Sequence, residues 1–108
     1  MTDYSKYIWH NNEIIDWDSA NIHVMSHVIH YGSGVFEGIK CYNTDMGPAI
    51  FRLNCHIDRL YQSAEVYNIK IPFDKESLIK GCIDIVTKNA LTDCYIRPIA
   101  FYGYDTLG

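Results

Sequence analysis

Residues 53–67 read LNCHIDRLYQSAEVY, and this stretch decides how the chain folds. Its apolar and aromatic side chains recur at steps of four and three: Leu53, Ile57, Leu60, Ala64 and Tyr67. That spacing predicts an amphipathic helix with one buried face. Asn54 is a residue type that caps the N-terminus of a helix. Asn68 and Pro72 favour an end to the helix, so we expect it to cover residues 54–67.

A second helix is predicted over residues 75–88. Asp74 precedes this stretch as a favourable N-cap, and Asn89 follows it as a stop signal. Four of its residues are expected to face inward: Leu78, Cys82, Ile85 and Val86. The second helix therefore also needs an apolar surface to pack against.

Runs of strand-forming residues surround the two helices. Strands are predicted over residues 7–10, 13–16, 35–42, 49–53 and 93–102. Asn11 and Asn12 are typical of a tight hairpin turn between the first two strands, and a short helical turn is expected to end at Gly32. Strands, two helices and a further strand indicate one α+β domain over residues 1–108 with a mostly antiparallel sheet.

Composition and charge exclude several classes of partner. The chain has 108 residues and a formal net charge of −4, and its arginines are Arg52, Arg59 and Arg97. A nucleic-acid partner needs a positively charged face, which so few scattered cations cannot form. No apolar run approaches the length of a membrane span, and the N-terminus has no apolar signal core. We therefore expect a cytoplasmic protein that contacts neither nucleic acid nor membrane.

The cysteines indicate a reduced protein. They are Cys41, Cys55, Cys82 and Cys94, and no two of them form a C-x-x-C pair. Free cysteine in an apolar run behaves as a small hydrophobic residue. We therefore expect four buried thiols and neither disulfides nor a cysteine metal site.

Two further patterns have an ordinary explanation beside a functional one. Residues 32–38 read GSGVFEG, one residue longer than a dinucleotide-binding loop, so we interpret the glycines as a turn into the following strand. His23, His27 and His30 are spaced to share one side of a helix, which is a geometry that suits zinc. No cysteine or carboxylate lies nearby as a fourth ligand, so we expect ordinary histidines and no metal site.

Three polar residues have the chemistry of an anion-binding site. Arg59 borders the apolar stripe of the first long helix, where a guanidinium can bind a phosphate or a carboxylate. Tyr95 and Arg97 project from the same face of the last strand, where a hydroxyl and a guanidinium can together receive a carboxylate. Solvated surface arginines are the alternative at both places, and the residue types alone leave both interpretations open.

Four segments together resemble the branched-chain amino acid aminotransferase family. They are residues 24–32 (VMSHVIHYG), 35–42 (VFEGIKCY), 56–60 (HIDRL) and 95–98 (YIRP). They occur in the order typical of the family, and the similarity extends from about Tyr7 to Gly103. The resemblance implies the small N-terminal domain of the D-amino acid aminotransferase-like fold. This pyridoxal-phosphate fold type is shared with D-amino acid aminotransferase and aminodeoxychorismate lyase.

The resemblance also implies roles for individual residues. Arg59 is expected to bind the phosphate of pyridoxal phosphate. Tyr95 is expected to meet the substrate α-carboxylate, and Arg97 the side-chain carboxylate of glutamate. Phe36 is expected to line the apolar pocket for leucine, isoleucine and valine, and Tyr31 to reach into the partner subunit of a homo-oligomer. We further expect Arg59 and the Tyr95–Arg97 pair to open onto a common cleft.

Part of the family's catalytic machinery has no counterpart here. The Schiff-base lysine, the acid that faces the pyridine nitrogen and the glycine-rich phosphate loop belong to the larger C-terminal domain of the family. None of the lysines matches the Schiff-base position: Lys6, Lys40, Lys70, Lys75, Lys80 and Lys88. We therefore expect an N-terminal fragment that is inactive alone, and name no catalytic residue. Its alternatives are the two relatives of the same fold type and a non-catalytic binding or oligomerisation module.

Overall fold

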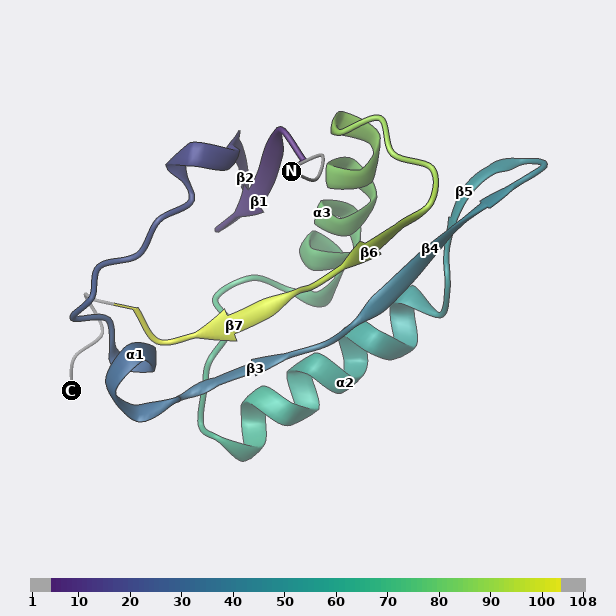
Figure 1. The fold of residues 1–108 in the computed structure, drawn as a ribbon. Helices are drawn as coiled ribbons and strands as arrows, with labels where there is room; N and C mark the ends of the chain where they lie inside the picture. Colours follow the sequence, from purple (N-terminus) through teal and green to yellow (C-terminus); the bar gives the residue numbers. More distant parts are fainter. Residues whose placement is uncertain (1–4, 104–108) are drawn as a thin grey trace.

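The computed structural model describes residues 5–103 and confirms an α+β fold (Figure 1). Its strands are β1 (Tyr7–His10), β2 (Glu13–Asp16), β3 (Gly34–Phe36), β4 (Ile39–Thr44), β5 (Gly47–Ile50), β6 (Cys94–Ile96) and β7 (Ile99–Phe101). Its helices are the 3-10 turn η1 (Trp17–Ser19), α1 (His27–Tyr31), α2 (Leu53–Val66) and α3 (Lys75–Lys88). Among these described helices, none combines the length and the apolar character that a membrane span requires.

The described strands pair antiparallel in three small sheets. β1 pairs with β2, β3 pairs with β7, and β4 pairs with both β5 and β6. Because β3 leads into β4 and β6 leads into β7, these two segments run alongside each other as one long ribbon (Figure 1). α2 packs against α3 and β3, and α3 packs against β1. This arrangement brings Phe36 of β3 close to Tyr95 and Arg97 of the β6–β7 segment.

Each of the two long predicted strands is interrupted once. The strand expected over residues 35–42 divides at Glu37 and Gly38, and the strand expected over residues 93–102 divides at Arg97 and Pro98. The breaks lie opposite each other, where the Glu37 N–H donates to the Pro98 carbonyl over 3.1 Å. Proline has no N–H to return to the partner strand, so the regular ladder stops there.

Both ends of α2 differ from the predicted ends. Arg52, with a φ of 53°, occupies the N-cap, and Asn54 lies inside the first turn without a capping role. The predicted strand before the helix accordingly ends early, at the close of β5. Tyr67 follows the last helical residue and is 66% exposed, so its predicted inward position is wrong. Ile69 is buried instead, and its N–H donates to the Ala64 carbonyl over 2.8 Å.

The predicted bounds of α3 are confirmed because local signals set both of its ends. Asp74 caps the helix by accepting the Ser77 N–H over 2.8 Å. Asn89 ends the helix and also attaches the first hairpin to it. Its side-chain oxygen accepts the backbone N–H groups of Lys6 and Tyr7 over 2.9 and 3.0 Å.

The core lies between the β3–β4 segment and the facing sides of α2 and α3. Its buried residues are Val35, Ile39, Ile57, Leu60, Ala64, Ile69, Leu78 and Cys82. Fully burying a side chain the size of leucine or isoleucine contributes roughly 1.5–3 kcal/mol. Val86 is buried as predicted, whereas Ile85 is only partly buried. The core therefore fixes the strand that carries the break at residues 37–38.

The four cysteines are free, but they are not all buried. Cys41 and Cys82 are buried, Cys94 is partly buried and Cys55 is exposed. Burial raises the pKa of the Cys82 thiol to about 11. The expectation of four buried thiols is therefore wrong for Cys55, which lies on the solvent side of α2, and overstated for Cys94.

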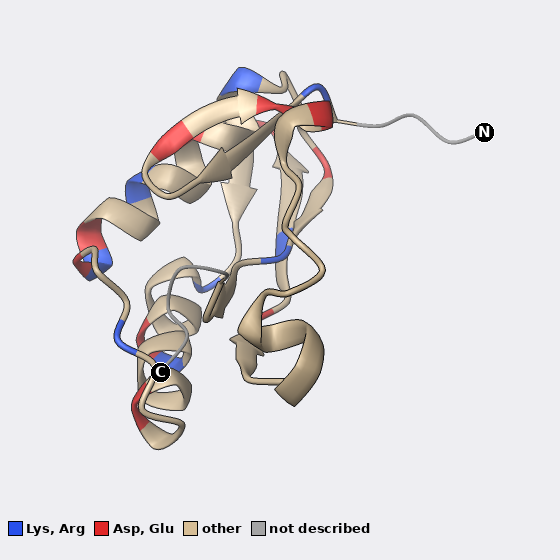
Figure 2. Cartoon of the chain, turned by 90° about the vertical axis from the view of Figure 1, so that its left-hand side faces the viewer, with Lys and Arg blue, Asp and Glu red and all other residues tan. Residues whose placement is uncertain are grey.

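Charged residues are absent from one stretch of the chain. Residues 19–36 contain no lysine, arginine, aspartate or glutamate, and Figure 2 shows α1 and its approach without charge colour. Large apolar residues of this stretch are exposed: Ile22, Val24, Met25, Ile29, Tyr31 and Phe36. Exposed apolar side chains that lie together on a protein surface usually mark an interface.

Candidate functional site

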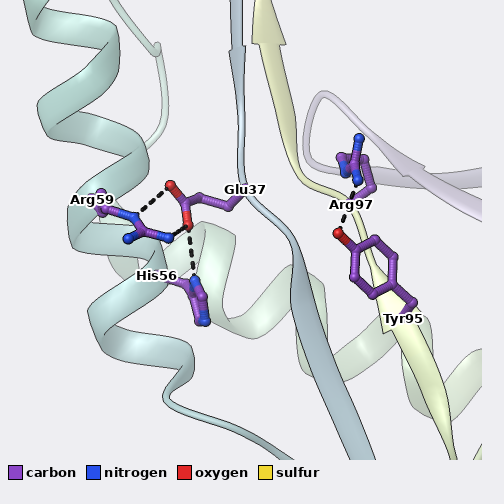
Figure 3. A network of polar contacts seen from close by, with 5 residues as sticks. All are labelled: Glu37, His56, Arg59, Tyr95 and Arg97. Carbon is purple, nitrogen blue, oxygen red and sulfur yellow. Dashed lines mark hydrogen bonds and ion pairs between the residues drawn. The ribbon is translucent and has the colours of Figure 1, made fainter.

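The break between β3 and β4 separates two groups of side chains. In extended backbone, neighbouring residues point to opposite faces. Glu37 points toward α2, and Tyr95 and Arg97 lie on the other side of the strand (Figure 3). We call the two groups the Glu37 cluster, which contains Glu37, His56 and Arg59, and the Tyr95 cluster, which contains Phe36, Gly38, Tyr95 and Arg97.

The Glu37 cluster is built around a buried carboxylate. Glu37 is only 6% exposed. Arg59 donates to it from Nε over 2.9 Å and from Nη2 over 2.7 Å, in the paired geometry that suits a guanidinium and a carboxylate. His56 Nδ1 lies 2.8 Å from the same carboxylate. Both partners come from α2, so one helix supplies the two side chains that bind the Glu37 carboxylate.

The charge of Glu37 follows from these partners. The hydrogen bonds from Arg59 lower the pKa of Glu37, burial opposes this effect, and the hydrogen bond with His56 lowers the pKa further. The net direction is downward, so Glu37 is a carboxylate at neutral pH. Glu37 in turn raises the pKa of Arg59 through the same hydrogen bonds. The pair is therefore ionic.

One edge of Arg59 remains open. Its hydrogen bonds within residues 5–103 use Nε and Nη2, which leaves Nη1 without a partner in that part of the chain. The side chain is 65% exposed. An open pocket beside it is lined by Phe51, Arg52, Cys55, His56, Asp58, Arg59 and Gln62. Arg52 and Arg59 give this pocket cationic donors that suit an anion, and Asp58, which also lines it, is paired with Lys75 over 3.2 Å.

In the Tyr95 cluster, uncharged groups hold the guanidinium of Arg97. Arg97 Nη2 donates to the Tyr95 hydroxyl over 2.9 Å, which confirms that the two side chains share one face. The Arg97 guanidinium carbon lies 4.4 Å from the centre of the Phe36 ring, at a distance typical of a cation–π contact. No carboxylate of residues 5–103 forms an ion pair with Arg97. Its charge is therefore oriented without being neutralised.

Gly38 lies directly beneath Tyr95. A Cβ atom added to Gly38 would lie 1.9 Å from the Tyr95 hydroxyl oxygen, closer than real atoms approach. Only glycine therefore lets the hydroxyl occupy this place. Tyr95 is 58% exposed, so the ring covers the strand on one side and meets solvent on the other.

The predicted site residues do not all come together. Phe36, Tyr95 and Arg97 form one cluster, whereas Arg59 is directed to the opposite face of the Glu37–Gly38 backbone (Figure 3). In residues 5–103 the expected common cleft of Arg59 with Tyr95 and Arg97 is therefore not formed. Tyr31 lies apart on α1, 73% exposed, with its ring centre 4.5 Å from that of His27.

Sequence reasoning missed three residues of these clusters: Glu37, Gly38 and His56. Gly38 had a usable signal, because a glycine inside a strand pattern often marks a close approach of another group. Glu37 also had one, because it is the only charged residue between strand-forming neighbours in residues 35–39. His56 carried none, since its role depends on a partner 19 residues away.

The three histidines near α1 each have a hydrogen-bond partner of their own. His23 lies before α1, so the three do not share a helical face as the spacing predicted. Its Nδ1 accepts the N–H of Met25 over 3.0 Å. His27 Nδ1 lies 2.5 Å from the Ser33 hydroxyl, and His30 Nε2 lies 3.0 Å from the Val24 carbonyl. These contacts match the interpretation of ordinary histidines.

Comparison with known proteins shows which family the chain belongs to. The family described as Amino-transferase class IV matches residues 34–108, which is more than half of the chain. The chain belongs to the class IV amino-transferase family. The matched residues include every member of the Glu37 and Tyr95 clusters.

Individual members of the class IV family support the earlier resemblance. The branched-chain-amino-acid aminotransferase of Escherichia coli (strain K12) is 45% identical over 102 residues, which are 94% of this chain and 33% of the relative. A crystal structure of the Escherichia coli branched-chain amino acid aminotransferase has a TM-score of 0.92 at 44% identity, covering 97% of this chain and 34% of that one. The branched-chain aminotransferase of Thermoproteus uzoniensis with norvaline has a TM-score of 0.90 at 33% identity, covering 97% and 36%. The chain spans about a third of the length of the relatives it matches.

Proposed function

We propose that this chain forms the substrate- and phosphate-facing part of a transaminase. The reaction transfers an amino group between leucine, isoleucine or valine and 2-oxoglutarate. The observation that carries the proposal is Arg97, which lies against Phe36 and the Tyr95 hydroxyl with no ion-pair partner in residues 5–103. A guanidinium held only by neutral groups keeps its capacity to bind a carboxylate. The neighbouring ring suits an aliphatic side chain, so one surface serves both kinds of substrate.

Such a transaminase has to accept an aliphatic side chain and a carboxylate at the same place. A guanidinium that bound leucine shields from water would be costly without a partner. The contacts of Arg97 with Phe36 and Tyr95 reduce that cost, because they persist without any substrate carboxylate. Tyr95 accepts a hydrogen bond from Arg97, so its own O–H is left to donate. We propose that this O–H meets the α-carboxylate of the amino acid.

We propose pyridoxal phosphate as the cofactor, because its phosphate group fits the donor set. A phosphate needs fixed cationic donors, and Arg59 offers its Nη1 edge beside a pocket that Arg52 and His56 also line. When bound, this cofactor supplies the electron sink for chemistry at the substrate α-carbon. In this chain Arg59 would hold the phosphate, while Tyr95 and Arg97 would orient the amino acid. Arg59 would then approach the bound ligands from one side of the Glu37–Gly38 backbone, and Tyr95 and Arg97 from the other.

We also propose that the uncharged segment at residues 19–36 faces a second subunit, with Tyr31 directed into the partner's site. The support is the exposure of Tyr31 and its apolar neighbours on a stretch without charge. Multi-angle light scattering of the 108-residue chain is expected to show self-association, or strong binding of a dye specific for apolar surface. A monomer that binds no such dye would contradict this part of the proposal.

The test of the reaction uses a completed enzyme, in which residues 1–108 replace the matching third of the Escherichia coli relative. We expect it to exchange amino groups between leucine and 2-oxoglutarate at rates comparable to those of the unmodified relative. Transfer from D-alanine, or cleavage of aminodeoxychorismate, in place of leucine turnover would assign the chain to another branch of the fold type. A folded completed enzyme that binds the cofactor and turns over none of these substrates would favour a non-catalytic module.

A further inference from the structure

We propose that Glu37 is a positioning residue that presents Arg59 to the cofactor phosphate. This inference rests on the proposed function, because it assumes that Arg59 binds that phosphate. Glu37 itself would not touch the ligand, because its carboxylate is buried and fully engaged with α2. Its role is to set the direction in which Arg59 points.

The geometry of the ion pair supports this role. An arginine side chain that is 65% exposed has many rotamers, and a phosphate anchor that moves freely binds weakly. Glu37 takes Nε and Nη2 in a two-point contact, which fixes the plane of the guanidinium. The edge that carries Nη1 then faces away from Glu37, and Arg59 lines a pocket together with Arg52. Only the outward edge is left for a ligand.

The position of Glu37 in the chain adds a second consequence. Phe36 lies under the Arg97 guanidinium, Gly38 lies under the Tyr95 hydroxyl, and Glu37 between them holds Arg59. Three consecutive residues therefore fix where Arg59, which would bind the phosphate, lies relative to Tyr95 and Arg97, which would bind carboxylates. An ion pair that only stabilised the fold would not need this place between two residues of the Tyr95 cluster.

The test compares pyridoxamine phosphate with pyridoxamine, which lacks the phosphate and, like it, has no aldehyde to modify lysines. Affinities are measured by fluorescence titration of the completed enzyme and of its Glu37→Gln, Arg59→Ala and doubly substituted forms. We expect Glu37→Gln to weaken pyridoxamine phosphate about tenfold, the order of one charge-assisted contact, and to leave pyridoxamine unchanged. The double variant should lose no more phosphate affinity than Arg59→Ala alone, because the two residues act as one unit.

Each other outcome has a definite meaning. Equal weakening of both ligands by Glu37→Gln, or additive losses in the double variant, would overturn the positioning role and make Glu37 a purely structural residue. A phosphate-specific loss in Arg59→Ala with none in Glu37→Gln would also overturn it, while leaving the proposed function intact. If Arg59→Ala itself has no phosphate-specific effect, the phosphate role of Arg59 in the proposed function fails.

A second readout does not depend on the loaded enzyme. In nuclear magnetic resonance spectra of the 108-residue chain, the Arg59 Nε–H should give a slowly exchanging signal because Glu37 accepts it. The signal should broaden in Glu37→Gln. The matched control His56→Gln changes the other partner of the same carboxylate and should leave the signal visible, since the two bonds from Arg59 remain. An unprotected Arg59 signal in the unsubstituted chain would overturn the proposal.

Discussion

Arg59 and Arg97 lie on opposite faces of the same short segment, residues 36–38, and their surroundings differ in kind. Arg59 is paired with a buried carboxylate that neutralises one edge of it. Arg97 is held by a ring and a hydroxyl, neither of which carries charge. Arg59 is thus a fixed cation with one edge already hydrogen-bonded to a carboxylate. Arg97 is an oriented cation without a counter-ion in the described part of the chain. The difference explains how one strand could serve a permanent ligand and an exchanging one.

The strength of the contacts agrees with this division. A cation–π contact at an exposed site contributes about 0.5–1 kcal/mol, which orients Arg97 without competing with a substrate carboxylate. The two-point contact of Arg59 with Glu37 is charge-assisted and therefore stronger than a neutral hydrogen bond. Exposure of Arg59 to solvent weakens it relative to a fully buried pair.

The largest expected effect tests the Arg97 side of the comparison. In the completed enzyme, Arg97→Ala should lower kcat/KM for glutamate roughly tenfold to hundredfold, the effect of losing a contact of about 1.5–3 kcal/mol. Turnover of leucine should change little, because leucine brings no second carboxylate and meets the ring of Phe36. Steady-state assays with both substrates measure the ratio. Equal losses for the two substrates would make Arg97 a structural residue.

The Arg59 side of the comparison is tested by the free energy of unfolding of the chain. Glu37→Ala should lower the free energy of unfolding by about 1–2 kcal/mol, because it removes a buried, hydrogen-bonded carboxylate. The loss stays at the low end because Arg59 can be solvated once its partner is gone. Arg97→Ala, an exposed substitution, should change stability by less than about 0.5 kcal/mol. Urea unfolding of both variants checks the contrast, and a larger loss in Arg97→Ala would reverse it.

A smaller effect is expected at Gly38. In Gly38→Ala the new methyl group displaces the Tyr95 hydroxyl, which otherwise lies directly over this residue. KM should rise about tenfold for leucine and glutamate alike, because both bring the α-carboxylate assigned to Tyr95. Tyr95→Phe is the matched control, since it removes the same hydroxyl without steric conflict. A normal KM in Gly38→Ala would show that the position of Tyr95 is unimportant for binding.

The smallest effect is a pH dependence with a defined sign. The pKa of Glu37 is lowered in the folded protein, chiefly by Arg59, so its contribution to stability is present above the unfolded pKa near 4.5. That contribution is lost as the pH falls through the folded pKa of Glu37. The difference in unfolding free energy between the unsubstituted chain and Glu37→Gln should therefore shrink from pH 7 toward pH 3. Asp74, whose pKa the contact with Ser77 also lowers, is common to both proteins and cancels.

The parts of the fold that could be predicted are those set by local chemistry. The bounds of α3 depend on Asp74 before it and Asn89 after it, and both signals are adjacent in the sequence. The start of α2 was misplaced because Arg52 adopts a left-handed conformation that its residue type does not favour. Tyr67 lies outside the helix for a related reason, since Asn68 directly after it adopts a left-handed conformation and the chain turns there.

The breaks in the two strands depend instead on residues that are distant in the sequence. The same holds for the contacts of the Glu37 cluster. The break at Glu37 arises where it meets Pro98, and the strand propensities of residues 35–42 run through it unchanged. Tyr95 and Arg97 were placed on one face correctly because alternation along a strand is local. Arg59 was recognised as a possible anion ligand, but its carboxylate partner lies 22 residues earlier on another element. Only tertiary structure could supply that pairing.

The most direct test of the two-arginine account is a crystal structure of the completed enzyme with N-(5'-phosphopyridoxyl)-L-glutamate. This compound carries a phosphate and a glutamate side-chain carboxylate in one molecule. We predict that the phosphate lies within hydrogen-bond distance of Arg59, whose Nε and Nη2 remain on Glu37, and that the side-chain carboxylate lies within hydrogen-bond distance of Arg97. A phosphate away from Arg59, or a side-chain carboxylate bound by other residues while Arg97 stays on Phe36, would contradict the account.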